Sequence, residues 1–301
     1  MRSTVHESID LSRAVMDYKG EGGLYENMPN LFVDWSQSNM EHNLQPVSLP
    51  INCLLARMFS ELGDLYAEAE WKAESENMWK ILKSIDPGLF SSTCADALVY
   101  QDGKYMPAGG YPTESGVALE VWSGLKDKKR DPDFINQFVE TMGTCPVKPA
   151  NVYYGRSNLF IGLCIRHDAL SQLGKIDTLI RELKDVYLPQ MMNGPGTLFE
   201  GIGEPSGCHG FNGHAGVLLM RDVLGLGEPH QLTKTVRIAP NPGTLEWASG
   251  KAGCKDGIIY VDWKVDKTAR KFTLNVRLPL GWEPEIVIPQ ELAGWKIEIN
   301  K

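Results

Sequence analysis

Residues 257–265 read Gly-Ile-Ile-Tyr-Val-Asp-Trp-Lys-Val, and residues 271–278 read Lys-Phe-Thr-Leu-Asn-Val-Arg-Leu. In both stretches apolar and polar side chains alternate, which is typical of a strand with one buried face. Similar stretches follow one another from Thr235, with Pro-Asn-Pro-Gly at 240–243 as a turn between them. The pattern predicts strands over 236–239, 244–248, 258–265, 272–278 and 284–288. We therefore expect residues 231–301 to form a separate domain, a small antiparallel β-sandwich.

Before about residue 230 the apolar residues recur with helical spacing instead. The clearest helices are predicted over 49–62, 66–85, 114–125, 132–142, 157–173, 176–192 and 211–224. Ser48 and Asp131-Pro132 are typical helix starts, and Gly225 is a typical stop. Short turns between helices alternate with long stretches rich in Gly, Pro, Asn and aromatic residues, where function usually lies. We therefore predict that residues 1–230 form a mainly α domain, an α/α toroid whose cavity opens toward the long loops.

Composition and charge exclude several classes of partner. The 301 residues are 43% hydrophobic and 23% charged, enough for a sizeable core. The formal net charge of −8 argues against nucleic acid or an anionic membrane surface, since both require a basic surface. No stretch approaches the roughly 18 apolar residues of a membrane span, and residues 1–10 show no signal peptide. We expect neither nucleic acid nor a membrane as partner. We also expect a cytoplasmic location, and this location is unknown if further sequence precedes residue 1.

The sequence shows no motif for a metal ion or a cofactor. Its six cysteines form no Cys-x-x-Cys pair. His209 and His214 lack the i, i+4 spacing of a helical zinc site. The glycines of 20–23 do not lie between a strand and a helix, as those of a phosphate-binding loop would. We therefore expect neither a metal nor a cofactor.

The first candidate site is the segment Phe32-Val33-Asp34-Trp35 in a long predicted loop. An exposed indole can pack on the apolar face of a pyranose, and a neighbouring carboxylate can accept hydrogen bonds from vicinal hydroxyls. The alternative is a structural role, with Trp35 buried in the loop and Asp34 capping a helix.

The second candidate site lies in a Gly-rich loop at 196–204, which contains Glu200 and Glu204. Glycoside hydrolysis requires two carboxyl groups that flank the glycosidic bond. Because these two are close in sequence, we expect only one of them to act in catalysis. His209 follows this loop in the sequence and is suited to donate to a sugar hydroxyl or to orient a carboxylate. The alternative is that His209 has a structural role.

In this order the motifs resemble the C-terminal part of the bacterial α-L-rhamnosidases, glycoside hydrolase family 78. The resemblance rests on Phe-Val-Asp-Trp at 32–35, Gly-Thr-Leu-Phe-Glu at 196–200, Cys-His-Gly-Phe at 208–211 and Val-Arg-Ile-Ala-Pro-Asn-Pro-Gly-Thr-Leu-Glu-Trp-Ala at 236–248. It implies a six-hairpin (α/α)6 toroid followed by a β-sandwich. With only about four predicted hairpins, we expect the toroid to be incomplete. The implied activity is inverting hydrolysis of terminal α-L-rhamnosides, with a rhamnose-containing glycan as partner.

The resemblance also assigns roles to single residues. Glu200 matches the general base that activates water, with Phe199 where the family usually has Trp. Asp34 and Trp35 match the loop that lines the rhamnose pocket, and His209 matches a substrate-binding histidine. No residue before Asp34 matches the segment that carries the general acid, so we expect little activity from the chain alone. A non-catalytic carbohydrate-binding or scaffolding protein, and another α/α-barrel enzyme such as an unsaturated-glycan hydrolase, are the alternatives.

Overall fold

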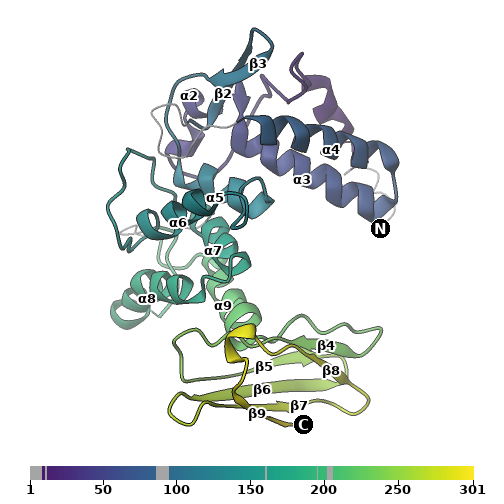
Figure 1. Ribbon diagram of the computed structural model, residues 1–301, viewed down its shortest axis with the longest axis vertical. Helices are drawn as coiled ribbons and strands as arrows, with labels where there is room; N and C mark the ends of the chain where they lie inside the picture. The colour runs from purple at the N-terminus through teal and green to yellow at the C-terminus, as the bar shows by residue number, and fades with distance from the viewer. Residues whose placement is uncertain (1–8, 11, 86–94, 160, 195, 202–205) are drawn as a thin grey trace. The chain divides into compact units, whose positions relative to one another are not determined.

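A computed structural model of the chain describes residues 9–10, 12–85, 95–159, 161–194, 196–201 and 206–301 (Figure 1). The contacts divide the chain into two compact units. The N-terminal unit comprises Met1–Ala169 and Glu200–Glu204, and the C-terminal unit comprises Leu170–Phe199 and Pro205–Lys301. A division into domains after residue 230 stays a prediction.

The N-terminal unit is built from helices and one small sheet (Figure 1). Its elements are η1 (Met16–Tyr18), η2 (Gln37–Asn39), α2 (Glu41–Leu44), β1 (Val47–Ser48), α3 (Leu49–Tyr66), α4 (Ala69–Ser84), β2 (Ala97–Gln101), β3 (Lys104–Pro107), α5 (Glu114–Ser123) and α6 (Pro132–Thr141). Helix α7 (Gly162–Gln172) contains the boundary between the units.

The C-terminal unit combines a helical segment with the strands of the last 70 or so residues. Its elements are α8 (Ile176–Asn193), η3 (Gly210–Gly213), α9 (His214–Leu218), the π-helical turn η4 (Leu219–Leu224), β4 (Thr235–Ile238), β5 (Trp247–Cys254), β6 (Gly257–Asp266), β7 (Lys271–Arg277), β8 (Glu283–Ile286), η5 (Gln290–Leu292) and β9 (Lys296–Asn300). Gly225 ends the last helical segment with a φ of 84°, which confirms it as a stop.

The predicted mainly α toroid is wrong. The fold is 42% helix and 20% strand and contains several sheets. Within the predicted helical region, β1, β2 and β3 form an antiparallel three-stranded sheet. The β2–β3 hairpin turns at Asp102 and Gly103, which have φ of 52° and 78°, as a tight two-residue turn requires. The prediction places this stretch in a loop because the strong helical periodicity on both sides conceals two short strands.

The predicted antiparallel β-sandwich is wrong in its strand directions. Strands β5, β6 and β7 are antiparallel neighbours, but β9 joins β7 in parallel, and β4 and β8 form a separate parallel pair. The alternation is confirmed: Val261 and Trp263 of β6 and Leu274 of β7 are buried on one face. Alternation shows which face is buried, but it carries no information on the direction of the neighbouring strand.

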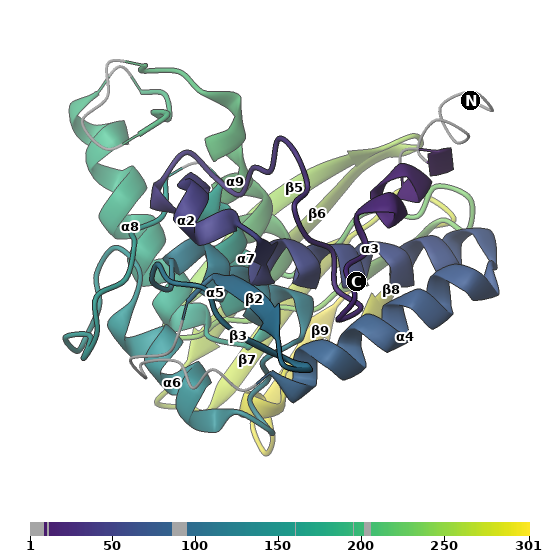
Figure 2. The same ribbon diagram turned by 90° about the horizontal axis from the view of Figure 1, so that it is seen from above.

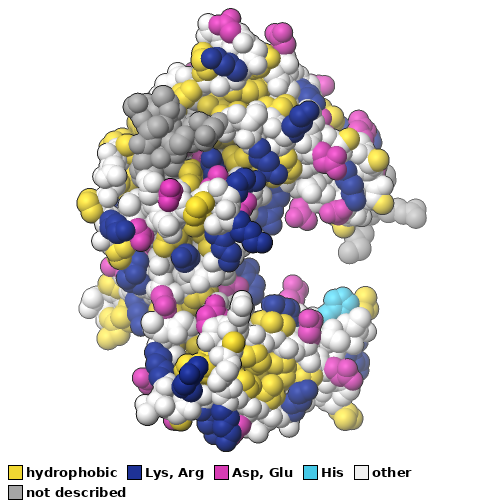
Figure 3. All heavy atoms as spheres, viewed as in Figure 1, with side chains coloured by type: hydrophobic (Ala, Val, Ile, Leu, Met, Phe, Trp, Pro, Cys, Tyr) yellow, Lys and Arg dark blue, Asp and Glu magenta, His cyan; other side chains and the backbone are white. Residues whose placement is uncertain are grey.

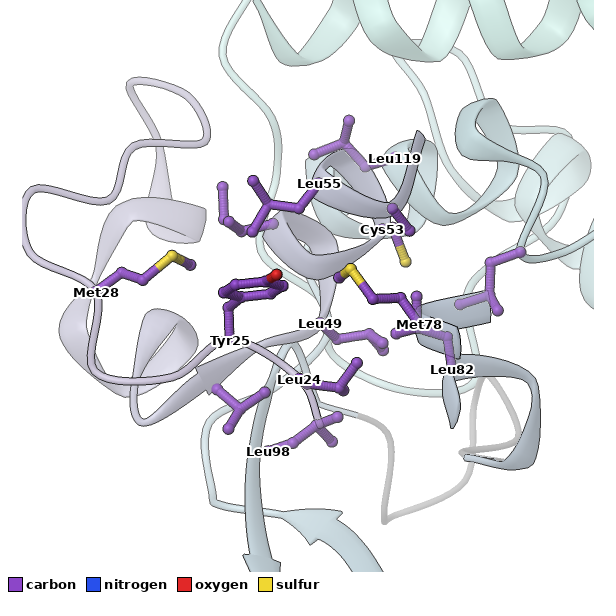
Figure 4. Close-up of a cluster of buried hydrophobic side chains, with 14 of the residues drawn as sticks. Leu24, Tyr25, Met28, Leu49, Cys53, Leu55, Met78, Leu82, Leu98 and Leu119 are labelled. Atoms are coloured by element: carbon purple, nitrogen blue, oxygen red, sulfur yellow. The ribbon is translucent and has the colours of Figure 1, made fainter. Parts of the chain in front are cut away.

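Helices α3 and α4 lie side by side as a hairpin and enclose the core of the N-terminal unit (Figures 1 and 2). Ser48 caps α3 as predicted, because its hydroxyl accepts a hydrogen bond from the Ile51 N–H at 3.4 Å. The ring of Phe59 stacks on Trp71 with centroids 5.2 Å apart. In the adjoining cluster of Figure 4, Tyr25 lies among leucine and methionine side chains. This rigid base supports the segment that leads into the Asp34 loop.

The surface is mixed in character. Figure 3 shows acidic side chains next to basic ones on the face in view, and hydrophobic side chains gathered on the visible side of the strand region. Within the described ranges, no helix combines the length and the apolar character that crossing a membrane requires.

Candidate sugar-binding site

Asp34 is fully buried and acts as the internal anchor of its loop. One carboxylate oxygen accepts hydrogen bonds from the hydroxyls of Ser36 and Ser38, and the other accepts from the Ser115 hydroxyl at 2.6 Å and the Asn158 N–H at 2.9 Å. A buried charge is tolerated when it is hydrogen-bonded in this way. Ser115 joins the loop to helix α5 and Asn158 joins it to the segment before α7, while the two serines fix the loop internally. Helix η2 is capped by Ser36 rather than by Asp34.

Trp35 points outward from this anchored loop. Its side chain is 65% exposed, so the alternative of a buried loop tryptophan is wrong. Phe32 meets the indole edge to face, with ring centroids 5.0 Å apart and an interplanar angle of 68°. The carbonyl of Trp35 also accepts from the Asn158 amide at 3.5 Å. Two exposed aromatic rings on a fixed backbone form a surface on which the apolar face of a sugar can pack.

A cavity of about 600 Å³ begins at the two residues that follow Trp35, Ser36 and Gln37. Tyr153 forms part of its wall and donates a hydrogen bond from its hydroxyl to Gln37 Oε1 at 3.0 Å. The ring of Tyr111 packs edge to face on Tyr153 with centroids 4.9 Å apart. No sequence motif marks Tyr111 and Tyr153, because these residues and Gln37 come together only when the loop at 143–156 folds back on η2.

Glu200 follows a backbone segment that is held on both sides. The N–H of Phe199 donates to Gln190 Oε1 at 2.8 Å, and the carbonyl of Phe199 accepts from the side-chain amide of Asn212. Tyr187 of α8 in turn donates to Asn212 at 3.2 Å. The side chain of Glu200 is half-buried. The backbone before Glu200 is thus fixed and its side chain is partly exposed, and its catalytic role stays a prediction.

His209 lies in the turn that anchors the same segment. Its N–H donates to the carbonyl of Leu198 at 2.9 Å, and its ring stacks on Phe211 with centroids 5.4 Å apart. Phe211 is 62% exposed. One face of the imidazole is therefore covered by the Phe211 ring.

The contacts assign the predicted site residues to different units. Asp34, Trp35 and Glu200 belong to the N-terminal unit, and His209 belongs to the C-terminal unit. Their joint action on one sugar, and the role of each, stay predictions. Glu204 lies outside the described residues. Across the described ranges, no group of three or more His, Cys, Asp and Glu side chains is placed to hold a metal ion.

The N-terminal unit holds two further buried carboxyl groups, those of Asp96 and Glu120, which no sequence motif marks. Burial raises the pKa of Asp96 to about 7, although Thr113 donates to it from both its N–H and its hydroxyl. Burial likewise raises the pKa of Glu120 to about 8, against the lowering effect of Lys126. Both carboxyl groups are at most 3% exposed, so they are structural rather than accessible to a ligand.

Comparison with known families and structures confirms the resemblance. Residues 233–296 match the sequence model of the bacterial alpha-L-rhamnosidase C-terminal domain. No curated protein matches the chain. Among solved structures, a family 78 rhamnosidase of Bacillus sp. GL1 aligns with a TM-score of 0.75 and 16% identity, over 96% of this chain and 30% of that one.

Two further solved structures are similar. The α-L-rhamnosidase of Streptomyces avermitilis, complexed with L-rhamnose, aligns with a TM-score of 0.60 and 15% identity over 92% of this chain and 26% of that one. The enzyme of Dictyoglomus thermophilum aligns with a TM-score of 0.53 and 15% identity over 93% and 30%. The chain thus has a fold related to these glycoside hydrolases and spans less than a third of their length.

Proposed function

We propose that this chain forms part of an α-L-rhamnosidase-type glycoside hydrolase and binds a terminal rhamnose-type sugar. The observation that carries the proposal is the exposed indole of Trp35 on a loop anchored by the buried Asp34 carboxylate. The family match at residues 233–296 supports it, and it also supports a separate C-terminal domain after residue 230.

Each predicted residue then has a distinct task. Trp35, backed by Phe32, packs on the apolar face of the sugar. Asp34 is a positioning residue that holds the indole in place, because protein donors surround its carboxylate. Glu200 activates the attacking water as general base of an inverting reaction, and His209 donates to a sugar hydroxyl.

A binding role without turnover is the second candidate for the isolated chain. An inverting glycosidase also needs a protonated carboxyl group beside the leaving oxygen. Asp96 and Glu120 have their pKa raised into the range of such an acid, but they are buried at 2% and 3% exposure. Neither of these two groups can therefore reach a sugar on Trp35.

The test is calorimetric titration of the chain with L-rhamnose, together with a hydrolysis assay on an aryl α-L-rhamnoside. We expect saturable binding and little turnover, since a positioned acid typically contributes 10²–10⁴-fold. Turnover that Glu200→Gln abolishes would support the catalytic role of Glu200 and would show that the chain contains an acid. The absence of saturable binding of L-rhamnose would contradict the proposal.

A further inference from the structure

The cavity beside Trp35 is chemically different from the aromatic surface on which the sugar packs. Its wall is formed by residues of η2, of the end of α6 and of the loop that joins α6 to α7. The lining residues are Ser36, Gln37, Thr141, Pro146, Lys148, Pro149, Ala150, Val152, Tyr153, Tyr154 and Arg156. Two of these described residues are cations and none carries a carboxylate, although the whole chain has a net charge of −8.

The two cations keep hydrogen-bonding capacity toward the cavity. Among the described residues, the Arg156 guanidinium donates to one group, the carbonyl of Gly143, and it lies 5.3 Å from the ring of Tyr154. A guanidinium has five N–H donors, so several remain. Lys148 pairs with Glu140 at 2.6 Å, and Glu140 is not part of the lining. An ammonium group has three donors, and this pair uses one of them.

The loop that carries both cations is held in place by hydrogen bonds near its two ends. The buried Glu114 carboxylate accepts from the Gly143 N–H, near one end of the loop. It also accepts from the N–H and the hydroxyl of Ser157, near the other end, at 3.1 and 2.9 Å. The Tyr154 hydroxyl donates to the carbonyl of Thr141 at 3.0 Å. A cavity wall fixed in this way is preformed, and a preformed wall lowers the entropic cost of binding a ligand.

We propose that this cavity binds the glycan residue next to the sugar on Trp35, and that this residue carries a carboxylate. The proposal rests on the proposed function, since it takes Trp35 as the platform for the terminal sugar. Gln37 and the Tyr153 hydroxyl offer polar groups to sugar hydroxyls, while Arg156 and Lys148 face the carboxylate. The substrate class is therefore a rhamnose-type sugar linked to a uronic acid. A planar guanidinium pairs with a carboxylate through two parallel hydrogen bonds.

The test compares two disaccharides, L-rhamnose linked to a uronic acid and the same compound with its carboxyl reduced to an alcohol. Calorimetry at low and high salt gives both affinities, with L-rhamnose alone as reference. We expect the acidic disaccharide to bind about fivefold tighter, the upper end for one exposed ion pair. This preference should shrink at 1 M salt, because screening weakens exposed charge pairs.

Variants separate this cavity from the rest of the surface. Arg156→Gln and Lys148→Gln should each reduce the preference for the acidic disaccharide and leave L-rhamnose binding unchanged. Lys104→Gln, an exposed lysine of β3 outside the lining, is the matched control and should keep the preference. Urea unfolding of each variant confirms that it is folded.

The outcomes distinguish this inference from the proposed function. If the chain binds L-rhamnose but binds the two disaccharides with equal affinity, the carboxylate-binding role of the cavity is overturned and the proposed function stays intact. Binding of the acidic disaccharide only, dependent on Arg156 and without any binding of L-rhamnose, would support the cavity and contradict the role of Trp35. Absence of binding by every compound would overturn both.

Discussion

Replacing Asp34 with Ala should unfold the chain more easily and weaken sugar binding at the same time. The substitution removes the acceptor for four donors, of which the hydroxyls of Ser38 and Ser115 belong to fully buried residues. Each buried donor left without a partner costs about 1–3 kcal/mol. We therefore expect the free energy of unfolding to fall by about 3 kcal/mol, since these two hydroxyls lose their acceptor inside the protein, whereas the partly exposed Ser36 and Asn158 find other partners.

Replacing Trp35 with Ala should separate the two effects. The indole is 65% exposed, so its loss should change the free energy of unfolding by less than about 1 kcal/mol. L-Rhamnose affinity should nevertheless fall about tenfold, the result of losing an aromatic contact worth about 1.4 kcal/mol. Urea unfolding and calorimetry measure the two quantities on the same samples.

A matched aspartate controls for the loss of a charge. Asp64 has a side chain that is 70% exposed and pairs with Lys72 at 2.7 Å. Asp64→Ala should change the free energy of unfolding by no more than about 0.5 kcal/mol and leave L-rhamnose affinity unchanged. An Asp34→Ala variant that is as stable as wild type, or that binds L-rhamnose with wild-type affinity, would contradict the anchoring role of Asp34.

Two further predictions concern stability. Asp96 and Glu120 keep their protons in the folded chain at pH values where the unfolded chain has released them. The free energy of unfolding should therefore fall as the pH rises from about 4 to 8. Each group should contribute a decrease of up to about 1.4 kcal/mol per pH unit. Glu120→Gln should flatten this slope in urea titrations at pH 5 and 8, and an unchanged slope would contradict the assignment. Gly225→Ala should lower the free energy of unfolding by more than Gly124→Ala does. Both glycines have a positive φ, but of the two only Gly225 has backbone atoms 2.2 Å from the position of an added Cβ. Thermal unfolding of the two variants compares them, and equal losses of about 1 kcal/mol would show that the contact at Gly225 relaxes.

The sequence predicted single elements better than it predicted their arrangement. Residues 176–192 were expected as a helix and form α8 with one residue more, because helical periodicity runs through the whole stretch. The Asp102-Gly103 hairpin was missed, although Asp-Gly is a strong turn signal, because its two strands have only five and four residues. The parallel partner strands β8 and β9 depend on contacts between distant segments, which a local pattern does not contain.

The candidate site divides in a similar way. Trp35 could be singled out from residue type and from the family resemblance, and its exposure agrees with a binding surface. The burial of Asp34 could not be predicted, because its partners Ser115 and Asn158 are 81 and 124 residues away in the chain. Tyr153 and Arg156 lie in a loop without any motif, and only the folded chain brings them beside Gln37.

Whether Trp35 binds the sugar can be measured by following the tryptophan side chains during a titration with L-rhamnose. In ¹⁵N-labelled protein each of the 8 tryptophans gives one indole N–H resonance, and the spectrum of Trp35→Phe identifies that of Trp35. Binding of the sugar by Trp35 predicts that this resonance shifts saturably with L-rhamnose while the indoles of the buried Trp71 and Trp263 do not move. A Trp35 resonance that stays in place at saturating L-rhamnose would contradict it.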